Sequence, residues 1–187
     1  GLSIWLLVLL TLKGIATQNI VSFTAYLVYG LCLLSLYLAS TLFHCLYFTK
    51  ARRLFQAFDH SSIYLLIAGT YMPYCLVGIG GKFGWGLWLA VALLMLFGIL
   101  YHALAKPRHQ IVETVICVLA GWLCVLGFKP LFQVLGFPGL LLLLAGGIAF
   151  TLGAVVYSLK LKYVHIYWHL LVILGSALMF CSIYFYL

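Results

Sequence analysis

Apolar residues in this chain form long, nearly unbroken runs that are separated by short polar breaks. The runs cover residues 2–12 (extending towards 16), 21–48, 58–77, 83–105, 111–128, 137–159 and 163–187. A helix needs about 20 apolar residues to cross the hydrocarbon core of a bilayer. The pattern predicts an all-α integral membrane protein, a seven-transmembrane helix bundle that forms one domain over residues 1–187. Because the first run is short and the chain opens at Gly1, we expect its start to be truncated.

The breaks between the runs are short and basic, and several contain Gly or Pro, which suits turns between antiparallel helices. Basic residues favour one side. Alternate breaks hold two unequal sets: Lys50, Arg52, Arg53, Lys106, Arg108, Lys160 and Lys162 against Lys13, Lys82 and Lys129. The positive-inside rule places the larger set in the cytoplasm. The N-terminus is then cytoplasmic and the C-terminus outside.

The composition supports a membrane protein and argues against other classes. Only 6% of the residues are charged, whereas a soluble domain has about 25%. The net charge of +8 comes from basic residues scattered singly or in twos and threes, so there is no basic face for nucleic acid. We expect these residues to meet anionic headgroups. Membrane lipids are the predicted partners, nucleic acid is not, and the sequence does not predict an oligomeric state.

A few polar residues interrupt the ends of the apolar runs. Ser40 and His44 are four residues apart near the end of the second run, and Asp59 opens the third. His165 and His169 are again four residues apart, at the start of the seventh. Residues four apart share one face of a helix. Polar groups inside membrane spans are rare and usually functional.

These residues are predicted to lie at similar depths. His44 is six residues from Lys50 and Asp59 is six from Arg53, which is about 9 Å along a helix in each case. The two histidines of the seventh run lie about 4.5 and 10 Å beyond Lys162 by the same rise. The predicted orientation puts all of them near the cytoplasmic side of the membrane.

This arrangement has the pattern of a metal centre. Two histidines at this spacing can bind one ion, and His44 would add a third nitrogen. Three protein ligands with an open fourth position are typical of catalytic zinc, which lowers the pKa of a bound water to about 7. Asp59 could then accept a proton or orient that water, and Ser40 could stabilise an oxyanion. Nitrogen ligands also suit other transition metals.

Each residue taken alone has a simpler interpretation. His44 could be a hydrogen-bonding group at the membrane interface, and Asp59 could pair with Arg53 or cap the third helix. Ser40 could bond back to its own helix. Their combination at matched depth favours the metal centre.

Other polar residues are expected to play smaller roles. His60 points about 100° away from Asp59 around a helix, so we expect it at the interface or beside the site. His102 and His109 flank the basic break "AKPRHQ" and are expected to be solvated. The macrodipole favours Glu113 near a helix start, although a role beside the site stays open. Pro73 should kink the third helix.

Three segments, "STLFH", "FDHSSIYLLIAGTYMP" and "HIYWHLLVILGS", resemble the signature segments of the hemolysin III family. That family is related to the progestin and adipoQ receptors and, more distantly, to the alkaline ceramidases. The resemblance is closest to the bacterial branch, which implies a bacterial inner membrane. It also implies zinc near the cytoplasmic face, bound by His44, His165 and His169, with Asp59 and Ser40 around the zinc-bound water.

Three functions remain open at this stage. The first is a zinc-dependent membrane hydrolase of lipid amides or esters. The second is a receptor, sensor or membrane-homeostasis protein with a structural zinc. The third is a pore-forming haemolysin, which is disfavoured because few charged residues would line a channel.

Overall fold

The computed structural model describes residues 1–46, 48–107, 109–158 and 164–187, without the side chains of residues 53 and 165. In this part of the chain all regular structure is helical. The helices are α1 (Leu2–Ala16), α2 (Ile20–Cys45), α3 (Arg52–Met72), α4 (Gly81–Leu104), α5 (Gln110–Trp122), α6 (Phe128–Ser158) and α7 (Val164–Tyr186). A π-helix, η1 (Pro73–Ile79), follows α3, and a 3-10 helix, η2 (Leu123–Gly127), follows α5.

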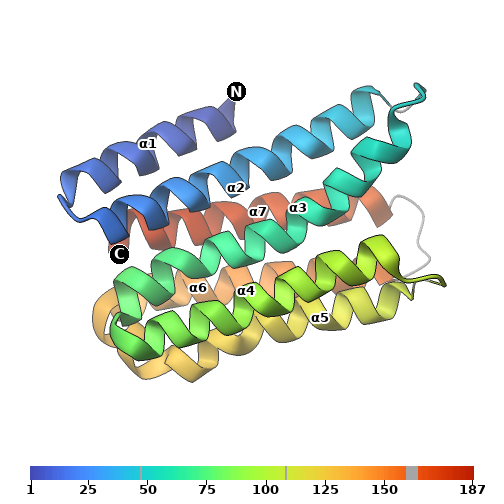
Figure 1. The fold of residues 1–187 in the computed structure, drawn as a ribbon. Coiled ribbons are helices and arrows are strands. Elements are labelled where there is room, and N and C mark those ends of the chain that lie inside the picture. Colours follow the sequence, from blue (N-terminus) through green and yellow to red (C-terminus); the bar gives the residue numbers. More distant parts are fainter. Residues whose placement is uncertain (47, 108, 159–163) are drawn as a thin grey trace.

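The helices run back and forth as an antiparallel bundle (Figure 1). α2 packs between α1 and α3, and α6 packs along α7. Five described segments are long and apolar enough to cross a membrane: Ile20–Cys45, Leu54–Ile79, Gly81–Leu104, Gln110–Ser158 and Ile166–Tyr186. The shorter α1 is also apolar. The chain is therefore a multi-pass membrane bundle.

One of these segments contains two helices. Gln110–Ser158 has 49 residues, which would be about 74 Å as one straight helix, more than twice the hydrocarbon core of about 30 Å. The chain turns back within it at η2 and at Gly136, whose φ of 62° and ψ of −176° are not helical. As a result α5 and α6 lie antiparallel (Figure 1). The expected count of seven spans and their orientation stay predictions.

The start of α3 differs from the expected one, and that of α6 differs only in part. α3 begins at Arg52 rather than at residue 58, so Asp59 lies in its third turn and the cap position belongs to Ala51. The alternative that Asp59 caps this helix is wrong. α6 as a whole begins at Phe128, but the non-helical residue Gly136 divides it, so its long second part begins at the predicted residue 137. The reason in the case of α3 is that exposed polar residues can continue a helix beyond the end of its apolar run.

Pro73 changes the type of helix. α3 ends at Met72 and the π-helix η1 begins at Pro73. Proline has no backbone N–H to donate within a helix, so the regular hydrogen-bond pattern cannot continue through it. Gly80, with a positive φ of 67°, ends η1 and precedes α4.

Two polar side chains join distant helices. The Lys13 ammonium of α1 donates to the carbonyls of Ile183 (2.9 Å) and Tyr184 (2.5 Å), which lie in the last turn of α7, where helix carbonyls lack partners. The Tyr71 hydroxyl of α3 donates to the Ala120 carbonyl (2.7 Å) and accepts from the Cys124 N–H (2.7 Å). The Tyr71 hydroxyl thus satisfies the Ala120 carbonyl and the Cys124 N–H, where α5 ends and η2 begins.

Candidate metal centre and its pocket

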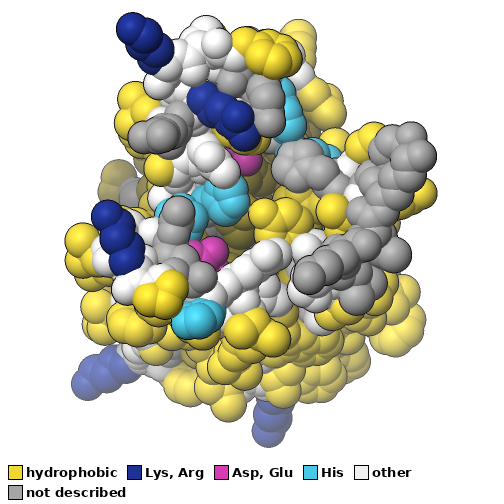
Figure 2. All heavy atoms as spheres, turned by 90° about the vertical axis from the view of Figure 1, so that its right-hand side faces the viewer, with side chains coloured by type: hydrophobic (Ala, Val, Ile, Leu, Met, Phe, Trp, Pro, Cys, Tyr) yellow, Lys and Arg dark blue, Asp and Glu magenta, His cyan; other side chains and the backbone are white. Residues whose placement is uncertain are grey.

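All of the histidines and acidic residues of the chain lie near one end of the bundle, which we call the histidine end. The chain has six histidines and two acidic residues. They occupy the ends of α2, α4 and the beginnings of α3, α5 and α7, or the turns beside them: His44, Asp59, His60, His102, His109, Glu113, His165 and His169. In Figure 2, which looks onto this end, acidic and histidine side chains lie beside one another around a hollow.

The structure brings His44 of α2 and His169 of α7 together. Their Nε2 atoms are 3.3 Å apart, and their ring centroids are 5.3 Å apart at an interplanar angle of 70°. His44 is exposed and His169 is half-buried. These residues are 125 positions apart in the sequence, so only the packing of the first and last parts of the bundle makes them neighbours.

The distance between the two nitrogens fits a shared metal ion. Nitrogens bound at about 2.05 Å to one tetrahedral zinc ion lie about 3.3 Å apart. An N–H···N hydrogen bond between the two rings has a similar length. His165 precedes His169 by one turn of α7, and its side chain lies outside the described residues. No group of three or more His, Cys, Asp or Glu placed to hold a metal occurs within the described part of the chain.

The two other predicted site residues lie close by in the fold. Ser40 is half-buried and precedes His44 by one turn of α2. Asp59 is half-buried on α3 and lines a polar pocket. Among the described residues, no hydrogen bond joins the Asp59 carboxylate to His44 or His169. Arg53, the predicted ion-pair partner of Asp59, has its side chain outside the described residues, as do Arg108, Lys160 and Lys162 of the predicted basic set.

The polar pocket lies between α3, α5, α6 and α7 and leaves about 80 Å³ for the centres of water-sized molecules. Both acidic residues of the chain line it, Asp59 from α3 and Glu113 from α5. The other polar groups in its wall are His60, Tyr64, Gln110, Thr114 and Tyr157. In this pocket the two acids of a basic chain face a common space.

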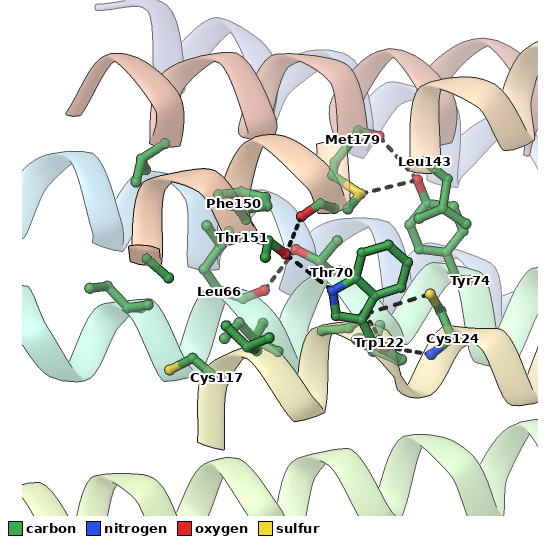
Figure 3. Close-up of a pocket in the computed structure, with 18 of the residues that line it drawn as sticks. Leu66, Thr70, Tyr74, Cys117, Trp122, Cys124, Leu143, Phe150, Thr151 and Met179 are labelled. Carbon is green, nitrogen blue, oxygen red and sulfur yellow. Dashed lines mark hydrogen bonds between the residues drawn. The ribbon is translucent and has the colours of Figure 1, made fainter. Parts of the chain in front are cut away.

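A larger apolar cavity, which leaves about 110 Å³ for the centres of water-sized molecules, adjoins the polar pocket. Ile63, Cys117, Ala154 and Trp168 line both spaces, and Trp168 is next to His169 on α7. Among the polar side chains of the cavity, the Trp122 indole donates to the Thr151 hydroxyl (3.1 Å), a contact that Figure 3 shows. The space therefore suits an apolar chain whose polar end lies at the histidine end.

A sequence profile described as "Haemolysin-III related" matches residues 1–180. The chain belongs to the haemolysin III-related family. It is 39% identical over 186 residues to "Hemolysin-3" of Bacillus cereus, covering 99% of this chain and 85% of the relative. It is 38% identical over 169 residues to "Hemolysin-3 homolog" of Bacillus subtilis (strain 168), covering 90% and 78%.

A human relative is more distant. "Monocyte to macrophage differentiation factor" is 28% identical over 174 residues, covering 86% of this chain and 69% of the relative. No solved structure matches the chain. The resemblance to the hemolysin III family is thus confirmed over nearly the whole chain.

In this haemolysin III-related chain, one contact of the site was missed by sequence reasoning. His102, expected to be solvated, is only 8% exposed, and its Nδ1 lies 2.9 Å from the Glu113 carboxylate. That expectation is wrong because the end of α4 packs against α5, which covers the imidazole. The sequence contains only a weak signal for this pair. Glu113, one of only two acids in the chain, lies near a helix start, eleven residues after His102.

Proposed function

We propose that this protein is a zinc-dependent membrane hydrolase that cleaves an amide or ester bond of a lipid, as the ceramidase-like relatives of its family would suggest. The observation that carries the proposal is the pair of imidazole nitrogens, 3.3 Å apart, beside a polar pocket that adjoins a large apolar cavity. An apolar lipid chain would occupy the cavity and place its polar bond near the pair.

The proposed ligands are His44, His165 and His169. The spacing of the two Nε2 atoms suits one ion, and neutral imidazole is a preferred zinc ligand. A bound zinc ion would polarise a carbonyl and make a water nucleophilic near neutral pH. The same three histidines also explain why polar side chains persist at this depth in an apolar bundle.

The remaining chemistry falls to two side chains. Asp59, half-buried in the wall of the polar pocket, would accept a proton from the attacking water. Ser40, one turn from His44 on α2, would donate a hydrogen bond to the oxyanion that forms at the carbonyl. General acid–base catalysis of this kind contributes about 100-fold to 10,000-fold in rate.

The test combines metal content with turnover. Wild type, His44→Ala, His169→Ala and Asp59→Asn are purified, and zinc is measured by elemental analysis. Hydrolysis is followed with a fluorogenic dodecanoyl ester and the matching amide, then with a broad lipid panel. His109→Ala is the matched control, because His109 is an exposed histidine at the same end.

We expect zinc to be lost from both histidine variants and retained in Asp59→Asn and His109→Ala. Hydrolysis should fall at least about 100-fold in Asp59→Asn and stay unchanged in His109→Ala. Equal, near-zero metal in wild type and His44→Ala would refute the metal centre. Bound zinc without any hydrolysis across the lipid panel would refute the enzyme.

A second function has its own supporting observation. His44 and His169 join α2 to α7, so zinc there could hold the bundle together in a receptor, sensor or membrane-homeostasis protein. In that case His169→Ala should lower the unfolding temperature, and Asp59→Asn should have no effect. The names of the bacterial relatives also suggest membrane lysis. Leakage from liposomes that contain the pure protein would reveal such an activity.

A further inference from the structure

A second group of titratable side chains lies at the histidine end, apart from the proposed zinc ligands. His102 of α4 and Glu113 of α5 form an ion pair of 2.9 Å, with exposed fractions of 8% and 18%. The His60 ring of α3 stacks on the His102 ring, with centroids 5.1 Å apart and an angle of 13°. Three helices therefore contribute to one compact group.

The hydrogen bonds of this group restrict where protons can reside. The His60 Nδ1 lies 2.8 Å from the Gln56 carbonyl, which can only accept, so this nitrogen carries the proton. The Nδ1 of His102 faces the Glu113 carboxylate. The Gln56 carbonyl and the Glu113 carboxylate therefore orient the two stacked rings.

Glu113 and His60 also face the pocket that Asp59 lines. A water needs about 10–15 Å³ of space for its centre, so the polar pocket, with about 80 Å³ of such space, has room for waters between the two carboxylates. Titratable side chains that line this pocket or interact with its lining residues are Asp59, His60 and Tyr64 of α3, Tyr101 and His102 of α4, Glu113 and Cys117 of α5, and Tyr157 of α6.

We propose that Glu113, positioned by His102 and His60, is a proton-relay group for hydrolysis in the Asp59 pocket. The inference rests on the proposed function and adds a residue to it. In ester hydrolysis the acyl C–O bond breaks and a new C–O bond forms to the water oxygen. One water proton ends on the alcohol, and the acid product loses the other at neutral pH. Asp59 accepts this second proton, which passes through pocket water to Glu113. Glu113, paired with His102, then releases it to solvent at the histidine end.

The test compares wild type with Glu113→Gln, which keeps the shape of the side chain and removes its proton exchange. Zinc-loaded full-length protein hydrolyses the dodecanoyl ester from pH 5 to 9, with and without added imidazole buffer. His109→Ala is the matched control, because His109 is an exposed histidine at the same end and lines neither pocket. His102→Gln is the second variant: it keeps Glu113 and removes its partner. Infrared spectra without substrate follow the carboxyl band of Glu113 as the pH changes.

We expect Glu113→Gln to lower kcat about 10-fold to 100-fold with KM, zinc content and unfolding temperature unchanged, and imidazole to restore the rate. His102→Gln should show the same rescue, and His109→Ala should match wild type. The pH-dependent carboxyl band should be absent from Glu113→Gln. The relay is overturned by an active wild type whose pH profile survives Glu113→Gln, by a loss that imidazole does not restore, or by a pH-independent band. A wild type without hydrolysis overturns the proposed function and the relay with it.

Discussion

Gly98 allows α4 to pack directly on Tyr64 of α3, and this contact lies behind the polar pocket. A Cβ added at Gly98 would be 2.5, 2.7 and 3.2 Å from three atoms of the Tyr64 ring, whereas ordinary contacts begin at about 3.4 Å. Tyr64 is 3% exposed and packed in the core. Gly98→Ala must therefore push the ring, and one side of the ring borders the polar pocket.

Overpacking of a core costs about 1–3 kcal/mol, and replacing a helical glycine by alanine contributes about 0.5–1 kcal/mol in the opposite direction. Gly86→Ala isolates the second effect, because Gly86 lies in the same helix and a Cβ there meets no atom within 4 Å. We therefore expect Gly98→Ala to be less stable than Gly86→Ala by about 1–3 kcal/mol.

The free energy of unfolding is measured by denaturant titration in detergent micelles, followed by circular dichroism. A double-mutant cycle with Tyr64→Ala completes the assay, since contacting residues show coupling energies of about 0.5–3 kcal/mol. Without the ring, Gly98→Ala should cost nothing. Equal stability of Gly98→Ala and Gly86→Ala in the wild-type background would refute the packing argument.

Two further predictions concern the polar contacts between helices. Lys13→Met should lower the free energy of unfolding by about 1.5–3 kcal/mol, the range for hydrogen bonds to charged groups, because it leaves the Ile183 carbonyl without its donor. The control is Lys82→Met, at an exposed lysine, which should change this free energy by less than about 0.5 kcal/mol. Tyr71→Phe should cost about 1–3 kcal/mol and speed hydrogen exchange at the Cys124 amide, which loses its acceptor. Denaturant titration checks the first prediction, and an unchanged free energy of unfolding in Lys13→Met would contradict it. Hydrogen-exchange mass spectrometry checks the second, and an unaltered exchange rate at the Cys124 amide would contradict it.

The sequence alone determined where the helices lie, because crossing a bilayer requires long apolar runs and the turns between them are short and polar. It also determined which residues share a helix face, such as Ser40 and His44, since the helix period is constant. All seven predicted runs contain a helix in the described structure. Boundaries were less certain: α3 starts early because Arg52, Arg53 and Gln56 can continue a helix, whereas the predicted start at residue 137 coincides with the break at Gly136 within α6.

Only the tertiary structure decided which helix faces meet. α4 is apolar around its whole circumference, so its composition does not tell that Gly98 faces Tyr64 or that His102 faces Glu113. The approach of His44 to His169 likewise depends on how α2 packs against α7, across 125 positions of sequence. Where helices are apolar on all faces, close packing rather than the hydrophobic pattern sets how each helix is rotated about its axis. That rotation places the polar side chains of the site.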